Sequence, residues 1–249
     1  MSESATIKVV CYSVALALVG TVFLALEFAD PGQAARAAQR HGPRLPRDTG
    51  SVAGPAQVVD GDTLDIHGVR VRLEGIDAPE TGQTCGRKWV GTWGCGAAAT
   101  HVLENLVRDR DVACDSMGAD KYGRMLAICH AGALELNAEM VRQGYAWAFL
   151  KYSARYIDAE AEARSARAGV WQGDADPPWV FRERRWASAE NAAPEGCAIK
   201  GNISNKGHIY HMPWSPWYGK VKVDEARGER WFCSETEAAT AGWRPANVK

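Results

Sequence analysis

Four carboxylates lie in two short segments where the chain leaves extended structure. Asp60 and Asp62 flank a glycine in VVDGDT, and Asp77 and Glu80 close the stretch VRLEGIDAPE. If the strands around these segments form a meander, Asp62 and Asp77 approach one another at strand ends. Converging carboxylates with few histidines favour a hard cation, Ca²⁺ before Zn²⁺. Taken alone, DGDT is more typical of a simple hairpin turn.

Two arginines supply the charge that a phosphate needs. Arg72 lies within the strand that leads to Asp77, and Arg124 follows the turn DKYG. An inward-pointing guanidinium is costly unless an anion meets it, and its planar fork binds two phosphate oxygens at once. These residues therefore indicate phosphodiester chemistry. A structural ion pair with Asp77 or Glu80 explains the position of Arg72 equally well.

The segments around these residues show strand and helix patterns in a defined order. Short β-type runs at 54–60, 62–67 and 69–76 are separated by the turn signals DGD and HG. Helical spacing begins near Gly94, and DVACDSM and GRMLAICH then indicate a strand pair. Two further helices are predicted at ALELNAEMVRQG and SARYIDAEAEARSARAGVW. This order predicts an α+β domain at residues 54–172, a small closed barrel with helices packed against it.

The N-terminal end differs from the rest in composition. Residues 9–26 form a run of 18 uncharged, mostly apolar residues, which as a helix of about 27 Å is enough to cross a bilayer core. The run ends in EFAD, a poor cleavage site. Residues 1–29 are therefore predicted to be an uncleaved transmembrane signal anchor, with a cleaved signal peptide as the alternative. Residues 30–53 are rich in Ala, Arg, Gly and Pro and predict a tether.

The cysteines and the basic residues point to different compartments. Arginines after the apolar run favour a cytoplasmic body, whereas six cysteines in three sequence-local pairs suit an oxidising compartment. We give the cysteines more weight and expect an exported chain, membrane-anchored and facing the periplasm or exterior, or secreted if the segment is cleaved. Cys114 and Cys129 flank a turn-like GADKYG and could face each other across a hairpin. The disulfide candidates are Cys85, Cys95, Cys114, Cys129, Cys197 and Cys233.

The composition of the C-terminal part predicts a separate small unit. Residues 173–195 contain DADPPW, which breaks regular structure, and are predicted to be an irregular linker. Residues 196–249 are predicted to form a domain rich in Trp and Gly. A zinc site could use Cys197, His208, His211 and Cys233, but a Cys197–Cys233 disulfide is the preferred prediction for an exported chain. Four tryptophans form either a ligand platform or the core that such a small domain needs: Trp214, Trp217, Trp231 and Trp243.

The surface offers a nucleic acid only local attraction. The formal net charge is −1, so a polyanion has to be held by a local patch or a metal ion. The loop TGQTCGRKWVGTWGC offers Arg87 and Lys88 as cations and Trp89 or Trp93 as stacking partners for bases. A disulfide-closed surface loop with ordinary charges is the preferred interpretation of this stretch.

The three motifs together are more specific than any one of them. VVDGDT, VRLEGIDAPE and DKYGRMLA, in that order, resemble the staphylococcal (micrococcal, or thermo-) nuclease family over about residues 54–171. The resemblance implies an OB-fold five-stranded β-barrel with three helices. It also implies a Ca²⁺-dependent endonuclease that acts on DNA and RNA and leaves 3′-phosphate products. The C-terminal unit resembles a small module on bacterial exported nuclease-like proteins and, distantly, Ada-type metal-binding domains.

The resemblance implies roles for the carboxylates. Asp62 and Asp77 match direct calcium ligands, and the backbone carbonyl of Ala78 matches a third. Asp60 matches an acid just outside the ligands. Glu80 matches the residue proposed as general base on the attacking water, with electrostatic anchoring as its alternative role.

The basic residues are assigned in the same way. Arg72 and Arg124 match the two arginines that clamp the phosphate, and Arg124 is also a proposed proton donor to the leaving oxygen. Lys121 and Tyr122 match residues that hold a terminal phosphate of the bound nucleotide. Leu150 stands where the family has a nucleotide-packing tyrosine, a departure that bears on base stacking and substrate affinity.

Three hypotheses of function follow. The first is a monomeric, membrane-anchored or exported Ca²⁺-dependent phosphodiesterase for DNA and RNA. The second is a binding module that keeps the nuclease fold without turnover, and the third is an envelope-associated interaction protein that works through its C-terminal unit. A pure binder has no need of the full set Asp62, Arg72, Asp77, Glu80 and Arg124, so the enzyme is favoured.

Overall fold

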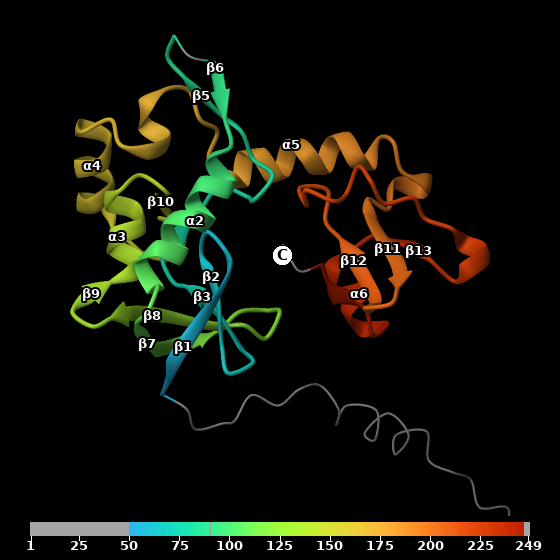
Figure 1. The fold of residues 1–249 in the computed structure, drawn as a ribbon. Helices are drawn as coiled ribbons and strands as arrows, with labels where there is room; N and C mark the ends of the chain where they lie inside the picture. Colours follow the sequence, from blue (N-terminus) through green and yellow to red (C-terminus); the bar gives the residue numbers. More distant parts are fainter. Residues whose placement is uncertain (1–49, 90, 247–249) are drawn as a thin grey trace, which may run out of the picture. The chain divides into compact units, whose positions relative to one another are not determined.

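A five-stranded barrel forms the centre of the computed structural model, which describes residues 50–89 and 91–246. The strand order is β3-β2-β1-β7-β8, and a parallel pairing of β3 with β8 closes the barrel (Figure 1). The two-residue strand β9 (Leu134–Glu135) extends the β8 edge. This architecture confirms the expected OB-type α+β fold. The barrel strands are β1 (Ser51–Asp60), β2 (Thr63–Ile66), β3 (Val69–Leu73), β7 (Asp111–Ala119) and β8 (Met125–Ala131).

The alternation of residues in β3 explains why one strand serves both core and site. Val71 and Leu73 are buried in the hydrophobic core, and Arg72 between them projects to the opposite face because side chains alternate along a strand. Strand β1 begins at Ser51, so the barrel starts three residues inside the segment predicted to be a tether. A register shift between Val58 and Asp60 interrupts the β1–β2 pairing beside the carboxylates. Such irregularities re-aim side chains at strand ends.

Three helices accompany the barrel, as expected: α2 (Cys95–Val107), α3 (Leu136–Arg142) and α4 (Ile157–Ser165). Helix α2 buries Ala99, Leu103 and Val107, a stripe at four-residue spacing that faces the core. Helix α3 ends just before Gly144, whose φ of 73° suits the left-handed position after a helix. No helix within residues 50–89 and 91–246 is long and apolar enough to span a bilayer. The predicted signal anchor at residues 1–29 lies outside the described residues.

Short strand pairs hold the loops that carry functional residues. Strand β4 (Ile76–Asp77) pairs with β10 (Trp147–Ala148), which fixes the backbone of Asp77 opposite Trp147. Strands β5 (Cys85–Arg87) and β6 (Gly91–Trp93) form a small hairpin in the loop before α2. The hairpin carries Trp89, which is fully exposed, whereas Trp93 packs edge-on against Tyr145.

The segment predicted to be an irregular linker, residues 173–195, is mostly helical. Helix α5 (Pro178–Glu190) follows the short 3₁₀ turn η1 (Gly169–Gln172), and η2 (Pro194–Gly196) comes after it. The prolines that suggested a break stand at the start of α5, where the missing N–H costs no hydrogen bond. The prediction of irregular structure was therefore wrong for this stretch.

The C-terminal unit is a small sheet with one helix. Strands β11 (Ile199–Ser204), β12 (Gly207–His211), β13 (Arg230–Phe232) and β14 (Arg244–Pro245) lie in the order β13-β11-β12-β14, accompanied by η3 (Glu225–Arg227) and α6 (Glu235–Thr240). Trp243 is buried with Phe232, so it belongs to the core rather than to a platform. Trp217 is 41% exposed and lies outside that core.

All six described cysteines form the three predicted pairs: Cys85–Cys95, Cys114–Cys129 and Cys197–Cys233. Cys114 and Cys129 are register partners in the β7–β8 pair, across the hairpin as expected. Because Cys197 and Cys233 are bonded to each other, the alternative zinc site in the C-terminal unit loses both of its thiolates.

Candidate active site

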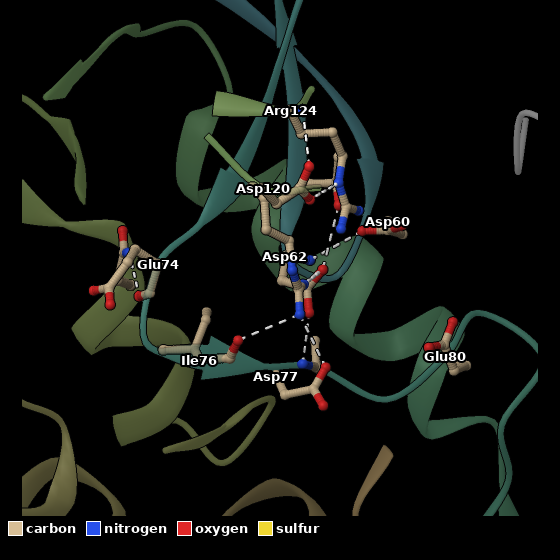
Figure 2. A network of polar contacts seen from close by, with 12 residues as sticks. Asp60, Asp62, Glu74, Ile76, Asp77, Glu80, Asp120 and Arg124 are labelled. Atoms are coloured by element: carbon tan, nitrogen blue, oxygen red, sulfur yellow. Dashed lines mark hydrogen bonds and ion pairs between the residues drawn. The ribbon is translucent and has the colours of Figure 1, made fainter. Parts of the chain in front are cut away.

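One guanidinium joins the two carboxylates that the sequence places at strand ends. Arg72 forms ion pairs with Asp62 and with Asp77, where its Nη2 donates to Oδ1 at 2.9 Å. Asp62 and Asp77 are 6% and 1% exposed. Figure 2 shows both side chains at the end of the barrel strands, with Asp60 beside them. The predicted approach of Asp62 to Asp77 and the predicted ion pair of Arg72 therefore occur together.

Backbone contacts fix the positions of these carboxylates. Asp62 Oδ2 accepts the N–H of Ala78 at 2.7 Å, which ties the turn after β1 to the residue that follows Asp77. The N–H of Asp62 donates in turn to Asp60 Oδ1 at 3.2 Å. Burial raises the pKa of Asp60, although the charge of Arg72 opposes that shift. Burial also lowers the pKa of Arg72, but a guanidinium stays charged across the physiological range.

A second arginine stands on the β7–β8 hairpin. Asp120 begins its turn and accepts hydrogen bonds from the backbone N–H of Tyr122, from the backbone N–H of Arg124 and from Arg124 Nε. Lys121 and Tyr122 occupy the exposed tip, where the Arg124 guanidinium lies 5.6 Å from the Tyr122 ring centroid. In Figure 2, Arg124 and Asp120 lie on the side of Asp60 and Asp62 that faces away from Asp77. Sequence analysis missed Asp120, although an aspartate at the first position of a turn is a usable signal.

Glu80 is held by its neighbour in the loop after β4. Its backbone N–H donates to Gln83 Oε1 at 3.2 Å, and its carbonyl accepts the Gln83 N–H at 2.7 Å. The side chain is 22% exposed. Burial raises the pKa of Glu80 to about 7, against the opposing attraction of Arg182. Gln83, which is buried, was not identified from the sequence.

A third arginine reaches the same carboxylates from far along the chain. Arg182, on α5, donates to Asp77 Oδ2 at 2.7 Å, to Asp77 Oδ1 at 3.1 Å and to Glu80 Oε1 at 2.8 Å. Burial alone lowers the pKa of Arg182, but its bonds and attraction to Asp77 and Glu80 outweigh that effect and raise it. No sequence signal identified this residue, because its segment was predicted to be an irregular linker.

The donor set suits a hard cation. Asp62 and Asp77 offer carboxylate oxygens from one small region, and oxygen is the ligand that Ca²⁺ prefers. No group of three or more His, Cys, Asp or Glu side chains in residues 50–89 and 91–246 is placed to hold a metal ion. The side chains that could bind a cation here are the carboxylates of Asp62 and Asp77, and the backbone carbonyl of Ala78 is a further candidate ligand. Water or substrate oxygens would have to complete the coordination.

The positions that bear on nucleotide binding are exposed, as Tyr122 on the β7–β8 hairpin already showed. Leu150 is 64% exposed in the segment after β10. Tyr152, two residues later, is also exposed and packs edge-on against Phe149. Arg87 lies over the Trp93 ring at 5.3 Å, so the β5–β6 hairpin does carry a cation beside an aromatic side chain.

The closed five-stranded barrel with its helices is an OB-type domain, and an arginine–carboxylate cluster lies at the ends of its strands. The family described as "Staphylococcal nuclease homologue" matches residues 70–173, and a second, described as ArfC, matches residues 183–245. An "Uncharacterized endonuclease" of Escherichia coli O157:H7 is 36% identical over 138 residues, which is 52% of this chain and 83% of the relative. The chain belongs to the staphylococcal nuclease family.

Two other relatives show the range of names within the family. A "Micrococcal nuclease" of Shigella flexneri is 35% identical over 144 residues, covering 51% of this chain and 77% of its own length. The "Succinoglycan biosynthesis protein ExoI" of Rhizobium meliloti (strain 1021) is 32% identical over 137 residues, covering 54% and 72%. These similarities cover about half of this chain.

Proposed function

We propose that this protein is a Ca²⁺-dependent endonuclease that hydrolyses phosphodiester bonds of DNA and RNA and leaves 3′-phosphate ends. The observation that carries the proposal is the double ion pair of Arg72 with Asp62 and Asp77. In this proposal Arg72 is the cationic donor for phosphate, and the two carboxylates beside it are the oxygen ligands for a cation. Family membership and the names of the relatives support the reaction class.

In this proposal each residue acts on a defined atom. Arg72 and Arg124 bind the non-bridging phosphate oxygens and stabilise the extra charge of the pentacoordinate state. Glu80 accepts a proton from the attacking water as its oxygen bonds to phosphorus. The bond from phosphorus to the 5′ oxygen breaks, and Arg124 donates a proton to that oxygen and regains one from solvent water. A calcium ion held by Asp62, Asp77 and the Ala78 carbonyl would neutralise phosphate charge.

The residues around the site support these roles by position. Asp120 orients the Arg124 guanidinium, and Gln83 fixes the backbone that carries Glu80. Lys121 and Tyr122, exposed beside Arg124, are the proposed contacts for a terminal phosphate. Trp89 is an exposed aromatic side chain that could stack on a base, which matters more here because Leu150 replaces the family tyrosine.

The proposed location is outside the cytoplasm. Three disulfides support an oxidising compartment, since such bonds are rare in reducing ones. We propose that residues 1–29 anchor the protein in the membrane or direct its export, and that it acts as a monomer. Fractionation of expressing cells, with N-terminal sequencing of the product, tests the location and shows whether the segment is cleaved.

The activity test uses the purified full-length chain. Closed circular DNA and single-stranded RNA should be cut in Ca²⁺ and left intact in chelator, and end-group analysis should show 3′-phosphates. Glu80→Gln should lower the rate by about 10²-fold or more, because general-base catalysis typically contributes that much. A variant as fast as wild type would remove Glu80 from the mechanism.

A non-catalytic binding module is the second candidate. The occupation of Asp77 and Glu80 by Arg182 favours it, because the guanidinium covers groups that a nuclease needs. A folded wild-type chain that binds nucleic acid but does not cut it at any Ca²⁺ concentration would support this candidate over the enzyme.

A further inference from the structure

Arg182 makes the most extensive set of ionic contacts with the candidate site from outside the barrel. Both oxygens of Asp77 and one of Glu80 accept its hydrogen bonds, at distances between 2.7 and 3.1 Å. Its side chain is 25% exposed, and that of Asp77 is 1% exposed. Charge-assisted, bidentate hydrogen bonds of this kind are strong and directional. Arg182 is therefore a part of the site and not a loosely placed surface arginine.

Contacts with the barrel domain hold the start of α5 in place. The Gly86 N–H donates to the Asp174 carbonyl at 2.7 Å, and Gln83 Nε2 donates to the Asp176 carbonyl at 2.7 Å. One turn before Arg182, Trp179 stacks on Phe149 with ring centroids 5.3 Å apart. Because Gln83 also bonds the backbone of Glu80, one buried side chain connects Glu80 to the approach of α5.

The guanidinium occupies the oxygens that a cation would need. Asp77 is the proposed metal ligand, and Glu80 is the proposed base. Ion pairing with Arg182 and coordination of a divalent cation both draw on the same Asp77 oxygens, and two cations close to one carboxylate also repel each other. Binding of one therefore weakens binding of the other, and by linkage the effect is reciprocal.

We propose that Arg182 is a positioning residue of the metal site that sets its calcium affinity. In the absence of metal, the Arg182 guanidinium neutralises and orients the Asp77 and Glu80 carboxylates. Calcium binds only when Arg182 gives up its hydrogen bonds to these carboxylates. The inference rests on the proposed function, because it takes calcium to be the competing ion. It assigns α5 a role in the site, although α5 follows the barrel and its three helices.

The face of α5 that carries Arg182 extends toward the C-terminal unit. Trp179, Arg182 and Trp186 are spaced by three and four residues and share one side of the helix. Trp186 packs against the core cluster of the C-terminal unit and lies 6.3 Å from Trp214. The affinity of the metal site is therefore coupled to how α5 is held by both of its neighbours.

The test measures Ca²⁺ affinity directly, by calorimetric titration of the full-length chain. Arg182→Gln keeps most of the side-chain volume and removes the charge. Arg182→Lys keeps the charge and removes the planar guanidinium that makes bidentate contacts. Arg184→Gln is the matched control, since Arg184 lies on the same helix and pairs with Asp176 on the surface. Circular dichroism confirms folding of each variant.

Arg182→Gln should tighten Ca²⁺ binding roughly tenfold or more, because charge-assisted hydrogen bonds no longer oppose it. Arg182→Lys should fall between this variant and wild type, and Arg184→Gln should match wild type. In chelator, Arg182→Gln should also have a lower melting temperature than Arg184→Gln. Calcium binding by Arg182→Gln alone, with none by wild type, would support the proposal as well.

Two results would overturn it. If wild type and Arg182→Gln bind Ca²⁺ equally, or the variant binds more weakly, the inference fails while the proposed nuclease stands. If no folded variant binds Ca²⁺, both the inference and the calcium dependence of the proposed function fail, and metal-free cutting of DNA then shows whether the nuclease assignment survives.

Discussion

Asp120 accepts two hydrogen bonds from Arg124, one from its backbone N–H at 3.0 Å and one from Nε at 2.6 Å. The carboxylate thus fixes both the turn and the direction of the guanidinium. Asp120→Asn should lower kcat by roughly tenfold with little change in KM, because a charge-assisted bond that aims Arg124 is lost. Steady-state kinetics on a short oligonucleotide measure both constants.

The control for Asp120 is Asp115→Asn. Asp115 lies on β7, the strand that leads to Asp120, and its side chain is exposed. It should leave kcat and KM unchanged. Equal effects of the two substitutions would show that Asp120 does not orient Arg124 for catalysis.

Arg72 is expected to contribute to stability as well as to phosphate binding. Removing it leaves the buried carboxylates of Asp62 and Asp77 without their shared partner. Arg72→Gln should therefore lower the free energy of unfolding by about 3 kcal/mol in chelator, as is typical when one member of a buried ion pair is deleted. Urea denaturation followed by tryptophan fluorescence measures the change.

Arg70→Gln provides the comparison for Arg72. Arg70 lies two residues earlier on β3 and pairs with Asp65 at 3.7 Å, with both side chains partly exposed. Its loss should cost less than about 1 kcal/mol. If the Arg70 substitution is as costly as the Arg72 substitution, the buried ion pairs do not stabilise the fold in the way proposed.

Asn137 connects α3 to the strands that carry the site. Its Nδ2 donates to the carbonyls of Glu74 and Ala127, and its Oδ1 accepts the N–H of Cys129 at 3.0 Å. Asn137→Ala leaves three backbone groups without these partners, so unfolding should become easier by about 3 kcal/mol or more. Activity should also fall, because the Glu74 contact steadies the turn that leads to Asp77.

An exposed asparagine gives the reference for Asn137. Asn105→Ala, on the outer side of α2, should leave stability and activity near wild type, since Ala favours helix. Thermal denaturation of both variants measures the difference in their melting temperatures. Similar melting temperatures would contradict the role given to Asn137.

Gly96 allows α2 to approach the loop that carries Glu80. A Cβ at Gly96 would collide with the carbonyl oxygen of Glu80, which the backbone cannot avoid without moving. Gly96→Ala should therefore displace Glu80 and reduce activity by roughly tenfold or more, since a shift of about 1 Å near the chemistry can cost 10²-fold. Rate measurements at saturating Ca²⁺ test this expectation.

Gly94→Ala is the matched control for Gly96. A Cβ at Gly94 would meet only the Ala97 Cβ, at an ordinary distance of 3.9 Å. Activity should stay at the wild-type level in this variant. If Gly96→Ala is as active as Gly94→Ala, the position of Glu80 does not depend on the close approach of α2.

Local sequence patterns were sufficient to predict the barrel and the approach of Asp62, Arg72 and Asp77. Alternation in VRVRL separates Val71 and Leu73 from Arg72, and the DGD and DKYG turns determine where chain reversals place Asp62 and Arg124. The cysteine pairs were equally readable, because Cys114 and Cys129 flank one hairpin. Such features depend on residues close together in the chain, which is why sequence analysis identified them.

Helix α5 shows where local patterns misled. Its prolines and the charged run RERR conceal the apolar spacing of Trp179, Trp186 and Ala189. Those residues form a helix because the barrel loops and the C-terminal core cover them, and the sequence does not show that covering. Only tertiary contacts could distinguish a helix from a linker here.

The sequence by itself determined which groups are available: two carboxylates at strand ends, two arginines near them, and three pairs of cysteines. Tertiary structure decided how those groups are paired. Arg182 meets Asp77 across 105 residues of chain, and Gln83 bonds both Glu80 and the segment before α5. Contacts over such separations depend on the packing of whole elements, and no short-range periodicity encodes them.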